Sequence, residues 1–223
     1  MIKQTLALVG LSFSIATNAA ISHNGYTLNE STNIVSGGGL EWLQWDETVR
    51  QSIDTALATY GHDGWRVASN VEMAELFSAF FPQLAWDTDE QTVQQLGLHD
   101  TLGSMDSPAN MFITLFGDTY AAGGFQCCGT GDNLQKARAF FGADTDGDSL
   151  FNQAVVFDEY TSWDAKLHDG SADLYGDGHK ASLYGVENGV ALVRISEVPI
   201  PAAGWLFISA LVGLVGIKRR SRR

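Results

Sequence analysis

Cysteine is almost absent from this sequence. Of its 223 residues only two are cysteines, and they are adjacent, at Cys127 and Cys128. Neighbouring cysteines cannot join distant parts of a chain, so a disulfide framework is excluded and a packed core has to hold the fold together. For the pair itself, a vicinal disulfide, free thiols, a bond between chains and a soft metal remain open, although zinc would need two further ligands.

Basic residues are also scarce between positions 21 and 196. This segment has 7 Lys and Arg against 25 Asp and Glu, a balance of −18. Such a surface repels nucleic acid and anionic lipid headgroups, so no nucleic-acid partner is expected. It is compatible with divalent cations and neutral glycans, and acidity alone also keeps a secreted protein dispersed.

Recognised catalytic motifs are missing as well. The sequence has no GxSxG elbow, no glycine loop that would cradle a phosphate and no HExxH helix. No motif therefore requires a cofactor, and we expect a protein that is not an enzyme.

The N-terminal residues, 1–19, have the pattern of a signal peptide. Lys3 precedes an apolar stretch from Leu6 to Ala16, and small residues follow up to Ala20. The apolar stretch is shorter than the ~20 residues that span a bilayer, and the small residues suit a peptidase, with cleavage expected after Ala19. The Sec machinery and signal peptidase are the implied partners.

The C-terminal segment, 197–223, combines an apolar run with a basic end. The run from 202 to 217 would span roughly 24 Å as a helix, slightly short of a hydrocarbon core of about 30 Å. A basic cluster stays on the cytoplasmic side and stops transfer. We therefore expect this helix in the inner membrane and the domain, 20–196, outside it. The basic cluster consists of Lys218, Arg219, Arg220, Arg222 and Arg223.

A proline motif precedes this apolar run. It reads Val198, Pro199, Ile200, Pro201 and Ala202, and an aromatic helix start, Trp205 to Phe207, follows. Together with the basic end, this order resembles the PEP-CTERM sorting tails of exopolysaccharide-producing Gram-negative bacteria, in the VPxPA variant, with Ile200 where the commonest form has Glu. The resemblance implies cleavage near the prolines by an exosortase and a final place at the cell surface or outside the cell.

The domain between the two ends predicts an α+β fold. Its last third is rich in strand patterns, with strands at 137–141 and 154–157 around an acidic turn. A hairpin is expected to join 182–186 to 190–195 across an Asn-Gly turn. The segment 99–133 stays unassigned. Further strands are expected at 25–28, 40–45 and 65–68. Helices are expected at 47–60, capped by Asp46, and at 89–96. Between them, another helix should begin at a capping box formed by Ser69 and Glu72 and end at Pro82.

Three short stretches carry a second resemblance. They are Gly39 to Leu43, Gly64 to Ser69 followed by Glu72, and Ala191 to Arg194. They are similar to the Lcl C-terminal type of domain, which often precedes PEP-CTERM tails, and distantly to C-type-lectin-like folds. Val67-Ala68 replaces the usual Leu-Pro, and the cysteines of that family are missing.

An alternating set of carboxylates suggests calcium. Asp144, Asp146 and Asp148 are spaced like the front of a calcium loop, since Ca²⁺ prefers several oxygen ligands from one turn. Glycine falls at the fourth position, and Val155 stands where a bidentate Glu belongs. The alternative is a hairpin loop of turn-forming Asp and Gly.

A second set could ligate zinc, and it defines the alternative function. Its members are His168, Asp169, Asp173, Asp177 and His179. On this interpretation the segment is a loop that serves a metal-dependent hydrolase, whereas a solvated acidic loop explains the same residues. The main expectation is a non-enzymatic surface module that contacts extracellular polysaccharide or Ca²⁺, and a purely structural matrix protein is a third hypothesis. Trp42, Trp45 and Trp65 are expected in the core.

Overall fold

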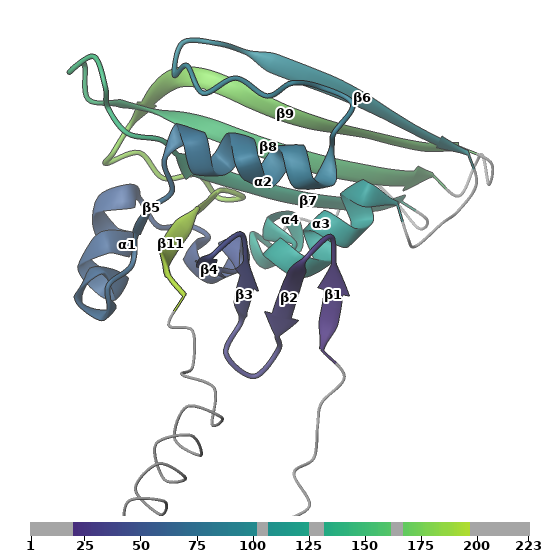
Figure 1. The fold of residues 1–223 in the computed structure, drawn as a ribbon, viewed down its shortest axis with the longest axis horizontal. Coiled ribbons are helices and arrows are strands. Elements are labelled where there is room, and N and C mark those ends of the chain that lie inside the picture. The colour runs from purple at the N-terminus through teal and green to yellow at the C-terminus, as the bar shows by residue number, and fades with distance from the viewer. Residues whose placement is uncertain (1–19, 102–106, 125–131, 162–166, 197–223) are drawn as a thin grey trace, which may run out of the picture.

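The computed structural model describes residues 20–101, 107–124, 132–161 and 167–196, which form an α+β fold with two β-sheets (Figure 1). This confirms the predicted class. The helices, with η for a 3-10 helix, are η1 (Trp45–Thr48), α1 (Ile53–Tyr60), η2 (Gly61–Asp63), α2 (Asn70–Phe80), α3 (Pro108–Phe116) and α4 (Thr119–Ala122). The strands are β1 (Ile21–His23), β2 (Tyr26–Asn29), β3 (Ile34–Gly37), β4 (Leu40–Leu43), β5 (Arg66–Val67), β6 (Gln94–Thr101), β7 (Asp132–Phe141), β8 (Leu150–Thr161), β9 (Leu167–Lys180), β10 (Gly189–Val190) and β11 (Leu192–Ile195).

The first sheet has six strands in the order β1-β2-β3-β4-β11-β5. The first four follow one another as an antiparallel meander. β11 comes from the far end of the domain and lies between β4 and β5, with Val193 opposite Trp42 and Leu192 opposite Val67. The last strand of the described chain is therefore an inner strand of the sheet.

The second sheet has five strands in the order β10-β7-β8-β9-β6. β7, β8 and β9 are long antiparallel neighbours, and β6 pairs with β9 along Gln94 to Thr101. The connection from β7 to β8 contains the three aspartates predicted to form a hairpin loop, so that part of the prediction is confirmed. A register shift lies near Phe151 and Gln153, where β9 carries two more residues than β8.

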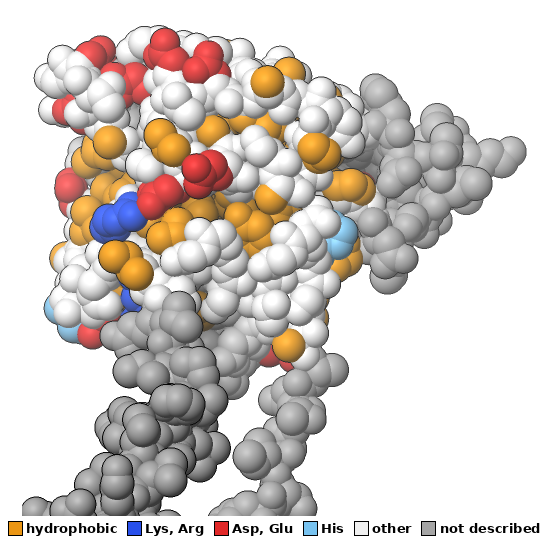
Figure 2. All heavy atoms as spheres, viewed as in Figure 1, with side chains coloured by type: hydrophobic (Ala, Val, Ile, Leu, Met, Phe, Trp, Pro, Cys, Tyr) orange, Lys and Arg blue, Asp and Glu red, His pale blue; other side chains and the backbone are white. Residues whose placement is uncertain are grey.

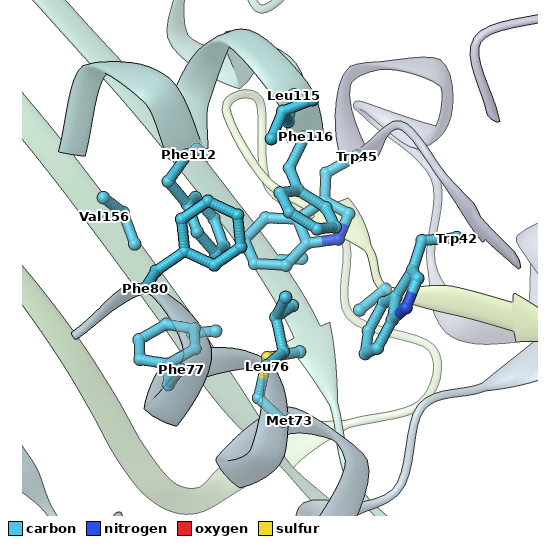
Figure 3. Packing of buried hydrophobic residues seen from close by; sticks show 14 of the residues in the cluster. Trp42, Trp45, Met73, Leu76, Phe77, Phe80, Phe112, Leu115, Phe116 and Val156 are labelled. Atoms are coloured by element: carbon cyan, nitrogen blue, oxygen red, sulfur yellow. The ribbon is translucent and has the colours of Figure 1, made fainter. Parts of the chain in front are cut away.

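Helices α2 and α3 fill the space between the two sheets. Figure 1 shows α2 in front of β8, and Figure 3 shows aromatic side chains from both helices converging beside Val156. Phe112 stacks on Phe116 with ring centroids 4.6 Å apart and meets the ring of Phe80 edge-on at 5.1 Å. Such pairs add to the area that the rings bury. This aromatic core is the packed interior that a chain without a disulfide framework requires.

A smaller apolar cluster lies under α1, on the other side of the six-stranded sheet. It joins Leu43 and Leu192 of that sheet to Ile53 of α1 and to Phe140 of β7. The predicted burial of Trp42, Trp45 and Trp65 is confirmed, and Trp86 is buried too.

The single helix predicted at 47–60 is wrong in its first half. The chain forms η1, then breaks at Arg50, whose φ is +65°, and α1 begins only after Ser52. The Ser52 hydroxyl caps α1 by accepting the N–H of Thr55. Asp46, the predicted cap, has its carboxylate against Gly117 instead, and burial together with Glu47 raises the pKa of that carboxyl.

Two further predictions fail because distant strands compete with local patterns. The segment 89–96 is not a helix, since β6 starts at Gln94 and turns Leu96 and Leu98 toward the core at the spacing of a strand. The hairpin at 182–195 does not form, because Val190 pairs in parallel with Phe140 and β11 pairs with β4 and β5. The unassigned apolar segment after 110 belongs to α3.

Both predicted export segments, 1–19 and 197–223, lie outside the described residues, and so do Cys127 and Cys128. Among the helices that the structure does describe, none has the length and apolar character needed to cross a membrane.

Candidate functional site

The three stretches that carry the lectin-like resemblance become neighbours in space. They form β4, β11 and β5, which lie side by side in the six-stranded sheet. Arg194 joins them, because its Nε lies 2.7 Å from a carboxylate oxygen of Glu41 and its guanidinium lies 4.5 Å from the ring centre of Trp65. These residues use their charges within the fold, which indicates a structural role.

The predicted capping box is confirmed and is extended by an ion pair. Ser69 accepts the N–H of Glu72, and the Glu72 carboxylate accepts the Ser69 N–H at 2.8 Å. Two nitrogens of Arg66 donate to the same carboxylate, at 2.8 and 2.5 Å. These hydrogen bonds, with Arg66 first, lower the pKa of Glu72 to about 2.

This ion pair predicts a specific dependence of stability on pH. A carboxyl whose pKa falls from 4.5 to about 2 on folding stabilises the protein above pH 4.5 and loses that effect as the pH drops toward 2. We expect Glu72→Gln to cost about 1–2 kcal/mol at pH 7, discounted for the exposure of Arg66, and progressively less below pH 4.5. Urea unfolding at pH 7 and pH 3 measures this. Glu75→Gln on the exposed face of α2 is the control, and an equal loss at both pH values would contradict the prediction.

The predicted calcium residues are brought together. Asp144, Asp146 and Asp148 are exposed, and one ligand oxygen from each lies within 4.8 Å of the others. Figure 2 shows acidic side chains gathered along the upper edge of the molecule, where Figure 1 places the connection between β7 and β8. The carboxylates also accept backbone N–H groups of their own loop, Asp144 from Gly147 at 2.7 Å and Asp148 from Leu150 at 2.8 Å. Turn formation alone therefore explains part of the Asp content.

Glu90, which lies outside this aspartate loop, holds the loop in place through hydrogen bonds. The sequence patterns did not predict this role. Glu90 is 5% exposed, and its carboxylate accepts both the N–H of Thr145, at 3.0 Å, and the Thr145 hydroxyl. Its own carbonyl accepts a hydrogen bond of 2.8 Å from Asn152 of β8. The loop is thus held to the segment before β6, a contact between positions 55 residues apart.

The predicted zinc loop is wrong as a structure. Positions 168–179 belong to β9. Because a strand rises about 3.3 Å per residue, the backbone positions of His168 and His179 lie roughly 36 Å apart along it, and the two residues cannot share one ion. The side chains of His168, Asp169 and Asp177 lie outside the described atoms. His179 packs its ring 5.1 Å from that of Phe140, and burial, followed by the charge of Arg138, lowers the pKa of His179.

Asp173, the remaining member, lies on the face of the five-stranded sheet that points away from α2 and α3. Its β8 partner is Val155, whose own partner on β7 is Arg138. On β8 and β9, Ala154 and Leu174 belong to the core, so the odd-numbered residues of these two strands face outward. The residues paired with them, Gln95 on β6 and Arg138 on β7, face the same way. We call the group on this outer face the outer-sheet patch. It consists of Gln95, Arg138, Gln153, Val155, Asp173 and Tyr175.

Whole-chain comparison does not name a relative. No family model, no curated protein and no solved structure matches the chain. The resemblances to sorting tails and to lectin-like domains stay predictions from short motifs.

Proposed function

We propose that this chain is an exported protein, sorted by an exosortase to the cell surface or the extracellular matrix, whose domain is a non-enzymatic binding or structural module associated with exopolysaccharide. The observation that carries the proposal is the order of features in 197–223. The proline motif, the apolar run and five terminal basic residues follow one another as in a sorting tail. The signal peptide pattern at 1–19 also indicates that the domain is exported, as the tail does.

The arrangement of the domain supports this role. Figure 1 shows the start of β1 and the end of β11 on one side of the molecule, with the five-stranded sheet toward the opposite side. A domain held through the segment after β11 would therefore present that sheet away from the membrane. The lectin-like fold is a finer part of the proposal, and its support is the adjacency of β4, β11 and β5.

Sorting is tested by removing the proline motif. We expect the double variant Pro199→Ala/Pro201→Ala to stay uncut and membrane-bound, because a helix could then continue through the site that the prolines keep extended. Fractionation of the native host and mass spectrometry of both termini measure the outcome. Pro82→Ala, at an exposed position after α2, is the matched control and should be processed normally. Normal release of the double variant would overturn the exosortase proposal.

Calcium binding is a second candidate, favoured by the convergence of Asp144, Asp146 and Asp148 within 4.8 Å. Saturating Ca²⁺, at a hundred times its Kd, should stabilise the protein by about 2.7 kcal/mol and raise its melting midpoint by roughly 5 °C or more. The triple Asp→Asn variant should lose this shift while keeping carbonyl oxygens for the loop's own hydrogen bonds. Asp54→Asn on α1 is the control. A midpoint that Ca²⁺ leaves unmoved in the natural protein would refute this candidate.

A further inference from the structure

Strand β6 forms the longest outer edge of the two sheets. It has eight residues and ends the five-stranded sheet, whereas the other edge strands in the described structure, β1, β5 and β10, have three, two and two. Alternate residues of an edge strand point their backbone N–H and C=O groups away from the sheet. Within the described part of the chain, Gln94 to Leu98 make no backbone-to-backbone hydrogen bond apart from the ladder with β9. The outward backbone groups of this stretch are therefore open to another strand.

The devices that usually protect such an edge are missing from β6. Natural edge strands are commonly short, interrupted by a bulge, or marked by Lys or Pro. β6 contains neither of these residues, and its register with β9 runs without a shift from Gln94 to Thr101. Val93, directly before the strand, is 58% exposed, and Gln95 and Gly97 are exposed as well. The edge is thus regular, accessible and partly apolar.

Charge is also missing from this edge. Positions 91 to 98 hold no charged residue, although the segment from 21 to 196 has 25 Asp and Glu against 7 Lys and Arg. Most of this acidic surface repels a second copy of the chain, but these positions do not. A charged peptide would find no countercharge along them. The uncharged edge therefore favours a second copy as the partner.

An antiparallel pair of β6 strands centred on Leu96 fits this pattern. In that register Leu96 lies opposite Leu96 of the second copy, Gln94 opposite Leu98, and Gln95 opposite Gly97. Like charges placed opposite each other destabilise a sheet, and this stretch contains none. Leu96 and Leu98 are only partly buried against the core, and a neighbouring strand would cover them further. The edge is complementary to itself, as a two-fold interface requires.

The geometry of such a pair is compatible with the position of the termini. Two antiparallel neighbours in one sheet are related by a two-fold axis perpendicular to that sheet, so the core faces of both copies lie on the same side. Figure 1 shows the start of β1 and the end of β11 on the side of the core face. Both copies would therefore direct their terminal segments the same way, as two molecules held in one membrane require.

We infer that β6 pairs antiparallel with β6 of a second copy of this chain and joins two five-stranded sheets into one continuous sheet. The inference goes beyond the proposed function, and the interface does not involve the sorting tail. Absence of this pairing in the purified protein would leave the result of the proline variant untouched, and the reverse holds as well.

Hydrogen exchange of the full-length protein, purified in detergent and followed by mass spectrometry at low and high protein concentration, tests the interface. We expect exchange in peptides covering Gln94 to Leu98 to slow by about tenfold at high concentration, because pairing satisfies the outward N–H groups. Light scattering corrected for bound detergent should show the mass rising from one copy toward two over the same range. A mass that stays at one copy overturns the inference. So does concentration-dependent protection found only elsewhere, or complete protection of β6 in the single-copy protein, which would mean that the same chain covers the edge.

The variant Val93→Lys/Gln95→Lys places positive charges of both copies near the two-fold axis, at exposed positions. It should raise the concentration needed for pairing by about tenfold and leave the melting midpoint unchanged. Val71→Lys/Ser78→Lys, at exposed positions of α2, makes the same change of charge and should pair as the natural protein does. Unchanged pairing of the β6 variant, or an equal loss in the α2 variant, would contradict the inference. The exchange measurement on the natural protein does not depend on how either variant folds.

Discussion

Phe112→Ala is expected to destabilise the domain by about 3–5 kcal/mol, the usual cost of deleting a fully buried phenylalanine. Phe112 lies where helices and both sheets meet (Figure 3). Its ring centroid is 4.6 Å from that of Phe116 and 5.3 Å from that of Trp45. Removing the ring leaves a cavity whose neighbours are themselves rigid aromatic side chains, so little collapse can offset the loss. Urea unfolding followed by tryptophan fluorescence measures the change.

Two further variants calibrate this result. Phe112→Leu keeps most of the apolar volume and should cost clearly less than the alanine variant. Val71→Ala, at a half-exposed position on α2, should change stability by at most ~0.5 kcal/mol. A loss below ~1 kcal/mol for Phe112→Ala would mean that the aromatic cluster does not hold the two sheets together.

Gly189→Ala should be nearly as harmful, although it adds only one methyl group. A Cβ at this position would lie 1.9 Å from the carbonyl oxygen of Trp45 and 2.9 Å from the hydroxyl of Thr48. The Trp45 contact is with backbone, so η1 or β10 has to move. That movement would strain the hydrogen bonds between Thr48 and Val190, of which the Val190 N–H donation measures 2.7 Å. We expect a loss of about 3 kcal/mol, at the upper end of overpacking effects.

Gly61→Ala provides the contrast for this variant. A Cβ there meets nothing within 4 Å, and the backbone is already helical. Alanine should be neutral or stabilise by up to ~1 kcal/mol, because it restricts the unfolded chain. Equal midpoints for the two variants in thermal unfolding would show that the close approach of β10 to η1 is not maintained in solution.

The sequence predicted those elements whose cause is local. The Ser69 and Glu72 capping box involves residues three positions apart, and the aspartate loop joins two strands that are consecutive in the chain. β6 could not be found this way, because its pairing partner β9 lies about 70 residues later and decides between helix and strand. The same holds for β10, whose Val190 pairs with Phe140 rather than with the nearer segment.

The candidate site shows the same division. The three aspartates are visible in the sequence because their spacing is short, and the structure brings them together. The outer-sheet patch combines β6, β7, β8 and β9, so only the register of four strands shows that Gln95, Gln153 and Asp173 share a face. The sequence predicts Asp173 as a zinc ligand in a loop, whereas the structure places it in β9. The predicted sorting tail is also a local pattern in the sequence. It is tested by following the processing of the proline variant in cells of the native host.

The position of β11 has a consequence for the timing of folding. The six-stranded sheet cannot be completed until Ile195 has been synthesised, because β11 separates β4 from β5. The complete six-stranded sheet can therefore form only after residue 195 has been translated. Contacts between residues far apart in the sequence also slow folding. On the proposed export route, a polypeptide whose sheet is still incomplete would pass unfolded through a translocation channel and would complete its fold on the far side.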